Sequence, residues 1–283
     1  MVPSISRCAW FCVILVLPVP ELRFLRLEDC AGYRLDLDRL DELVEARPWY
    51  AQELVSGDGF YAGNYTEPKR ALIFLANPNN PTGTWIDGDR LKSFLESVPR
   101  ETLVVVDEAY AEYVEEPGYP DCCAWLREHP NLVVTRTFSK AFGLAGLRIG
   151  YALSAPGVAD ILNRIRQPFN VNSVAQAAGV AALEDRSYLA RSVEINNAER
   201  HRVAAAFDSL GLRHVPSVGN FILVDFERPA APIYKALLRR AVIVRPVANY
   251  GLPQHLRITV GTEAQNERLL EALEPALKSA VQA

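Results

Sequence analysis

The sequence predicts an α/β protein with a mainly parallel β-sheet that carries helices on both faces, followed by a smaller C-terminal α+β domain. Two observations lead to this prediction. From Gly32 onward, short β-branched runs alternate with helical patterns, which is typical of crossover connections between parallel strands. Beyond Ser173 the pattern changes, because long helical stretches come first and short strands follow.

The first half of the chain supplies strands separated by helices. Apolar runs predict strands at 71–76, 103–107, 132–137 and 148–154. Helical patterns predict helices at 87–97 and 120–128, and the first of these begins with Asp87, which can cap free backbone N–H groups.

The second half supplies a different order of elements. We expect helices at 174–183, 187–210 and 263–281, and strands at 221–226, 242–244 and 256–260. The long helix then bridges two domains. The domain division that we predict is an atypical apolar segment at 1–31, a large domain at 32–185 with an insertion at 47–68, and a small domain at 186–283.

Composition excludes several classes of protein. The 283 residues are 49% hydrophobic and 23% charged, which excludes disorder as the main state. The net charge is −4 and the basic residues are scattered, which argues against nucleic acid as a partner. The five cysteines form no C-x-x-C pair and the four histidines stand far apart, so we expect no metal site and a cytoplasmic protein with reduced thiols.

A continuous apolar run at 10–19 stands apart from this composition. It is too short to span a bilayer, and no small-residue cleavage site follows it, although Arg7 precedes it as in a signal peptide. A buried strand or a leftover segment is the favoured interpretation over export, and we expect no membrane as a partner.

Three strand ends carry polar residues that suit chemistry. The loop at 77–83 (NPNNPTG) follows the first strand, and Asp107 ends the second with Tyr110 three residues later. The stretch at 135–148 (TRTFSKAFGLAGLR) follows the third strand and offers hydroxyls, Lys140 and Arg148. Each feature alone has a plain structural alternative: a tight turn, a capping aspartate or a solvated lysine. In open α/β sheets, however, ligands bind at the carboxyl edge where these strand ends meet.

These three stretches, in this order and at about this spacing, resemble the fold-type I (class I/II) pyridoxal-phosphate-dependent aminotransferases, and among them the histidinol-phosphate aminotransferases. The resemblance extends from about Gly32 to the C-terminus. It implies that Lys140 binds pyridoxal 5′-phosphate as an internal aldimine and shuttles the proton, and that Asp107 keeps the pyridine nitrogen protonated. It also implies that Asn80 and Tyr110 hydrogen-bond the phenolate oxygen of the cofactor.

The resemblance further implies anion-binding residues. The cofactor phosphate would bind Thr137, Ser139 and Arg148. For the substrate it implies Arg257 for the carboxylate, Arg245 for a phosphate group and Asn220 as a neighbour. A surface ion pair is the alternative for each arginine, and an ordinary turn is the alternative for Asn220.

The function implied is a histidinol-phosphate:2-oxoglutarate transaminase of histidine biosynthesis, which exchanges an amino group between L-glutamate and a phosphorylated imidazole substrate in a ping-pong cycle. The family also implies a homodimer. Two alternatives stay open: a related enzyme such as a threonine-phosphate decarboxylase or an aromatic aminotransferase, and an inactive remnant of the fold.

The start of the chain departs from the family pattern. Family members carry additional residues before the matched part. These include a phosphate-binding turn, an aromatic residue that stacks on the pyridine ring and a tyrosine that one subunit contributes to the active site of the other. None of these has a counterpart in 1–31, which suggests a truncated or wrongly started sequence and predicts weaker binding of the cofactor phosphate.

Overall fold

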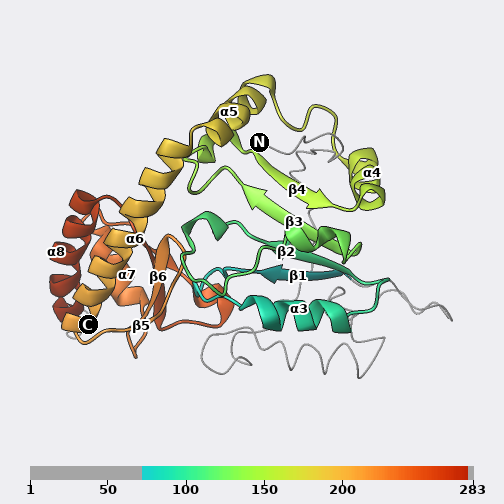
Figure 1. The fold of residues 1–283 in the computed structure, drawn as a ribbon. Coiled ribbons are helices and arrows are strands. Elements are labelled where there is room, and N and C mark those ends of the chain that lie inside the picture. Colours follow the sequence, from blue (N-terminus) through green and yellow to red (C-terminus); the bar gives the residue numbers. More distant parts are fainter. Residues whose placement is uncertain (1–71, 280–283) are drawn as a thin grey trace.

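The computed structural model describes residues 72–279. The predicted apolar segment at 1–31 and the predicted insertion at 47–68 lie outside these residues. The described part contains two four-stranded sheets that are joined by helices (Figure 1).

The first sheet has the strand order β1-β2-β3-β4. Its first three strands are parallel and the fourth is antiparallel to its neighbour. The strands are β1 (Leu72–Ala76), β2 (Leu103–Asp107), β3 (Leu132–Thr137) and β4 (Gly150–Ser154). The predicted mainly parallel sheet is therefore confirmed.

Helix α3 (Gly88–Ser97) covers one face of this sheet (Figure 1). The Asp87 carboxylate caps it by accepting from the backbone N–H of Arg90 at 2.9 Å. Phe94 of α3 is 1% exposed and packs with inward-facing strand residues, because alternate side chains of a strand point to the same face. The core formed there includes Leu75, Leu91, Leu95, Val104, Val106, Leu132 and Val134.

Three helices connect the two sheets. They are α4 (Pro156–Ile165), α5 (Ser173–Glu184) and α6 (Arg186–Ser209). Asn172 and Asp185 cap α5 and α6 with their side-chain oxygens. Figure 1 shows that α6 runs from the end of α5 toward the second sheet.

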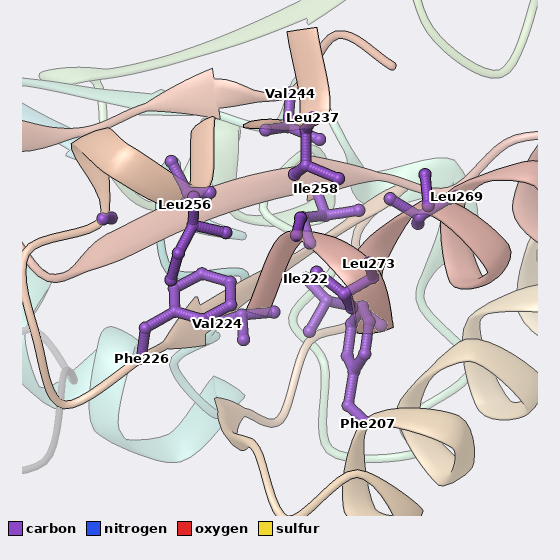
Figure 2. Close-up of a cluster of buried hydrophobic side chains, with 14 of the residues drawn as sticks. Phe207, Ile222, Val224, Phe226, Leu237, Val244, Leu256, Ile258, Leu269 and Leu273 are labelled. Carbon is purple, nitrogen blue, oxygen red and sulfur yellow. The ribbon is translucent and has the colours of Figure 1, made fainter. Parts of the chain in front are cut away.

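The second sheet is antiparallel throughout and has the order β5-β6-β8-β7. Helices α7 and α8 complete this half, and their apolar side chains form its core with the sheet and with Phe207 of α6 (Figure 2). The elements are β5 (Arg213–Val215), β6 (Phe221–Asp225), α7 (Ala231–Leu238), β7 (Arg245–Pro246), β8 (His255–Thr259) and α8 (Glu263–Ser279).

Two predicted elements are wrong. The helix at 120–128 is only a short 3-10 turn, Ala124–Arg127, because its bonds run between residues three apart and Pro130 prevents a longer helix. The strand at 242–244 does not form, because the Val242 N–H returns to the Leu237 carbonyl at 3.0 Å and closes the end of α7. The sequence analysis also missed β5, β7, α4 and α7.

Three further 3-10 turns lie in the connecting segments, at Ala111–Tyr113, Ala145–Leu147 and Ala248–Tyr250. Within residues 72–279, none of the helices has the length and apolar character needed to cross a membrane.

Candidate active site

The carboxyl ends of the three parallel strands lie side by side. The strand register places Ala76 opposite Asp107, and Asp107 opposite Thr135. Beyond the last pair, the Asn77 N–H donates to the Asp107 carbonyl at 3.0 Å, and the Glu108 N–H donates to the Thr135 carbonyl at 2.9 Å. The loop at 77–83, the acid and the lysine-bearing segment thus leave the sheet at one edge, as the sequence predicts.

Asp107 is held at this edge with one side open to solvent. Its carboxylate accepts a hydrogen bond from the Thr135 hydroxyl at 3.1 Å. The protein that encloses its other sides raises the pKa of Asp107 by desolvation, while the Thr135 hydrogen bond and the positive charge of Lys140 act in the opposite direction. Asp107 and Lys140 are therefore close enough to interact electrostatically.

Lys140 is half-buried beside the same strand ends. Its Nζ lies 5.3 Å from the centre of the Tyr110 ring. Burial lowers the pKa of Lys140, and the charges of Arg257 and Arg148 lower it further, whereas Asp107 raises it. A larger fraction of this amine is neutral than in a solvated lysine, and the neutral form is the nucleophile.

Tyr110 and Arg257 meet beside Lys140. Tyr110 is 5% exposed, and burial raises its pKa, which the charge of Arg257 opposes. Nη1 of Arg257 donates to Oδ1 of Asn80 at 2.6 Å. Burial lowers the pKa of Arg257, and its Nε is buried without a hydrogen-bond partner among the described residues. Such a guanidinium suits an incoming oxyanion.

The predicted phosphate ligands share the segment after β3. The Thr137 hydroxyl accepts from the backbone N–H of Ser139 at 3.1 Å, which folds this segment into a tight turn. Arg148 is exposed, and its Nη1 donates to the Ala145 carbonyl at 3.1 Å. Its backbone is left-handed at φ 52°, and its charge acts on Lys140. The arginine is thus close to the lysine but still accessible.

Arg245 and Asn220 are the two remaining predicted residues. Arg245 is exposed on β7 directly opposite Arg257 on β8, and its charge also lowers the pKa of Lys140. Asn220 precedes β6, and its carbonyl accepts from the Val260 N–H at 2.9 Å. In the described part of the chain, no hydrogen bond joins the side chain of Asn220 to another predicted site residue. The structure therefore brings Arg245 to the cluster electrostatically and gives Asn220 no such link.

The sequence analysis missed residues that support this cluster. Glu108, which follows Asp107, is fully buried, and its Oε2 accepts from Nε and Nη2 of Arg136 at 2.9 and 2.6 Å. The Phe221 ring contacts both the Tyr110 ring and the Arg257 guanidinium. The adjacency of two acids was a signal for Glu108, but an apolar ring such as Phe221 carries no chemical signal in a sequence.

The described residues contain no group of three or more His, Cys, Asp or Glu side chains placed to hold a metal ion. What they bring together instead is an amine, a carboxylate, a phenol, an amide and three arginines.

Comparisons with known proteins identify the family of this chain. Residues 18–273 match the family model "Aminotransferase class I and II". The chain is 58% identical over 214 residues to histidinol-phosphate aminotransferase 2 of Pseudomonas fluorescens, covering 76% of this chain and 58% of that protein. It is 57% identical over 202 residues to the protein of the same name from Pseudomonas aeruginosa, covering 71% and 55%.

Among solved structures, the fold is similar to histidinol-phosphate aminotransferase from Sinorhizobium meliloti in complex with pyridoxal-5′-phosphate. The TM-score is 0.69 at 36% identity, covering 74% of this chain and 57% of that one. The chain thus spans a little over half the length of these relatives. From the match over most of its residues, the chain belongs to the class I and II aminotransferase family.

Proposed function

We propose that the protein is a pyridoxal-phosphate-dependent transaminase of the histidinol-phosphate type. The observation that carries the proposal is the position of Lys140, whose pKa is lowered by burial and by arginines while Asp107 lies close enough to oppose that shift. The names of the relatives support the same activity, and L-glutamate and a phosphorylated imidazole compound are the substrates we propose.

The residues present fit the cofactor by their chemistry. Bound pyridoxal phosphate supplies an aldehyde, a phosphate and a pyridine ring that withdraws electrons when its nitrogen is protonated. Lys140 offers the amine for the aldehyde, Asp107 the carboxylate for the ring nitrogen, and Arg148 the cation for the phosphate, together with the Thr137 and Ser139 hydroxyls. Tyr110 and Asn80 offer hydrogen bonds to the ring oxygen.

The proton transfers fall to Lys140 in this proposal. Its Nζ in the neutral form can accept a proton from the carbon that carries the amino group and return it to another atom. Burial, Arg257 and Arg148 favour the neutral form and Asp107 favours the protonated form, so the surroundings of the amine support both states of this transfer.

Substrate binding falls to the arginines. Arg257 would bind the substrate carboxylate, since its Nε is buried without a hydrogen-bond partner in the described part of the chain and its side chain is already oriented by Asn80. Arg245 would bind the substrate phosphate, because it lies opposite Arg257 and is open to solvent. Asn220 would lie beside the substrate.

We also propose the organisation of the whole protein. The chain would divide near Asp185 into a cofactor-binding domain and a small domain, with α6 bridging them. It would act as a cytoplasmic homodimer, as its family membership suggests.

The Schiff-base role of Lys140 can be tested directly. Pyridoxal phosphate is added to the full chain, to Lys140→Ala and to Lys278→Ala, an exposed lysine on α8 that serves as the control. After borohydride reduction, we expect one fixed adduct per chain in the parent and the control and none in Lys140→Ala, as measured by absorbance and peptide mass. Equal labelling of all three proteins would contradict the proposal.

The reaction type needs a second measurement. Transfer of the amino group from L-glutamate should release 2-oxoglutarate and leave the aminated cofactor. Release of CO₂ from a phosphorylated amino acid without amino transfer would instead support the decarboxylase alternative.

A further inference from the structure

Phe221 occupies the junction between the two sheets at the candidate site. It is the first residue of β6 and is 1% exposed. The Arg257 guanidinium carbon lies 4.9 Å from the centre of its ring. The Tyr110 ring meets it nearly edge-on, with centres 5.2 Å apart and planes at 81°. One apolar side chain of the second sheet therefore contacts both polar groups that flank Lys140.

The contact with Phe221 orients the Arg257 guanidinium and leaves its positive charge available to a substrate carboxylate. A ring face attracts a guanidinium through its quadrupole but does not neutralise its charge. A carboxylate in the same place would orient Arg257 and also compete with a substrate carboxylate for it. In the structure, the guanidinium is oriented by the Asn80 amide oxygen, by a hydrogen bond with the Tyr110 side chain and by the Phe221 ring. Among the described residues, its Nε has no hydrogen-bond partner.

Phe221 also contacts Tyr110, which lies beside Lys140. Tyr110 belongs to the segment after β2, and its ring lies under Nζ of Lys140. Edge-to-face packing fixes the angle between two rings, so the orientation of Tyr110 depends on Phe221. Lys140, Tyr110, Phe221 and Arg257 are therefore joined by successive contacts in which two rings lie between two cations.

We propose that Phe221 is a positioning residue that orients Arg257 for a substrate carboxylate. This inference rests on the proposed function, in which Arg257 is the carboxylate ligand. Phe221 itself does not need to contact the substrate, and its effect passes through the guanidinium that it holds.

The test compares Phe221→Leu with Phe207→Leu in the full chain. Phe207 is also a fully buried aromatic residue of the C-terminal half, but it packs in the core away from Arg257. Both variants lose a ring and leave a similar cavity, so both lower the melting temperature.

Binding of succinate, a dicarboxylate that carries no amino or oxo group, is measured by calorimetry. We expect Phe221→Leu to weaken it by about five- to ten-fold through loss of the cation–π contact, and Phe207→Leu to leave it unchanged.

A double-mutant cycle separates positioning from general loss of structure. Phe221→Leu is combined with Arg257→Lys, which keeps the charge but removes the planar group that stacks on the ring. If Phe221 acts through Arg257, its substitution should have little further effect on succinate binding in the Arg257→Lys protein. For turnover, we expect Phe221→Leu to raise the KM for L-glutamate more than it lowers kcat.

Three results would overturn the inference: no measurable succinate binding by the parent chain, equal affinities in the parent and Phe221→Leu, or fully additive effects in the cycle. Failure of the proposed function looks different, because it appears as the absence of a Lys140 adduct with pyridoxal phosphate whatever the affinity for succinate.

Discussion

At the scale of single residues, the candidate site is defined by opposing charges around Lys140. Burial, Arg257 and Arg148 lower its pKa, and Asp107 raises it. The first three influences favour the neutral amine and the last favours the ammonium form. Changing one neighbour at a time therefore moves the pKa of Lys140 in a direction that the structure fixes.

We predict opposite shifts for two variants. Arg257→Gln removes a cation, so the pKa of Lys140 should rise toward its usual value and the amine should react only at higher pH. Asp107→Asn removes an anion, so the pKa should fall and the amine should react at lower pH. The measurement is the rate of the borohydride-trapped reaction of Lys140 with pyridoxal, which lacks the phosphate and so does not depend on the phosphate ligands.

Arg164→Gln is the control for this experiment, because Arg164 is an exposed residue of α4 that pairs with Asp160. Its profile of rate against pH should coincide with that of the parent. Shifts of the same sign in Arg257→Gln and Asp107→Asn would contradict the opposing charge effects, and unchanged profiles in both would show that burial alone sets the reactivity of Lys140.

At the scale of elements, the sequence predicted the strands of the first sheet within two residues of their bounds. In the two central strands, β2 and β3, the valines are buried, so the pattern and the packing agree there. In β1, Leu75 is buried and its neighbours are more exposed. The apolar run at 242–244 was misleading, because Ile243 is 83% exposed there and the segment closes a helix. Helix α4 was missed although its apolar residues recur at helical spacing, and the structure leaves Ile161 and Ile165 of that apolar side exposed.

The site was predictable only in part for a related reason. Parallel strands place their carboxyl ends together, so the meeting of Asp107 with the loop at 77–83 follows from the order of elements alone. The contact between Asn80 and Arg257 joins residues 177 positions apart, and it depends on how the second sheet packs on the edge of the first. Local patterns contain no information on that packing, so Phe221 could not be identified from them.

Hydrogen bonds from several elements fix the positions of the two sheets relative to each other near the site. Asn197 of α6 donates to the Tyr113 carbonyl at 3.1 Å, and Arg200 of the same helix donates to the Gly219 carbonyl at 3.3 Å. From the other side, the Gly83 carbonyl accepts from the Val218 N–H at 3.0 Å. These bonds fix the segments that precede Phe221 and follow Tyr110.

Gly83 gives a prediction at this scale. Its φ is +78°, and an added Cβ would overlap the side chain of Ser217. We expect Gly83→Ala to lower the free energy of unfolding by about 2–3 kcal/mol, through backbone strain together with the clash. The measurement is urea unfolding of the full chain.

Gly211→Ala is the matched control, because Gly211 has a similar φ of +68° but open space around it. Strain alone should then cost about 1 kcal/mol. The double variant Gly83→Ala/Ser217→Gly should recover most of the difference, because it removes the atoms that clash. If Gly83→Ala lowers the free energy of unfolding no more than Gly211→Ala does, the close contact between Gly83 and Ser217 is contradicted.

At the scale of the whole molecule, apolar side chains gather on the surface around α4 and α5. Ile165 is 58% exposed, Phe169 96%, Val174 68% and Val180 61%. Beside them, Phe138, Ile149, Val171 and Val180 line a hollow of about 590 Å³. Exposed apolar side chains that cluster in this way favour association, whereas scattered ones do not.

We predict that this surface controls self-association of the protein. Ile165→Lys/Phe169→Lys should lower the mean mass in light scattering and delay aggregation, since it places two charges on the patch. The melting temperature should change little, because neither side chain is buried. Leu238→Lys/Ile243→Lys is the control. These side chains are 40% and 83% exposed but lie on the C-terminal half, away from α4 and α5, so the same two charges there should leave the mass unchanged. Equal effects of the two charge additions would mean that net charge, rather than this surface, determines the association.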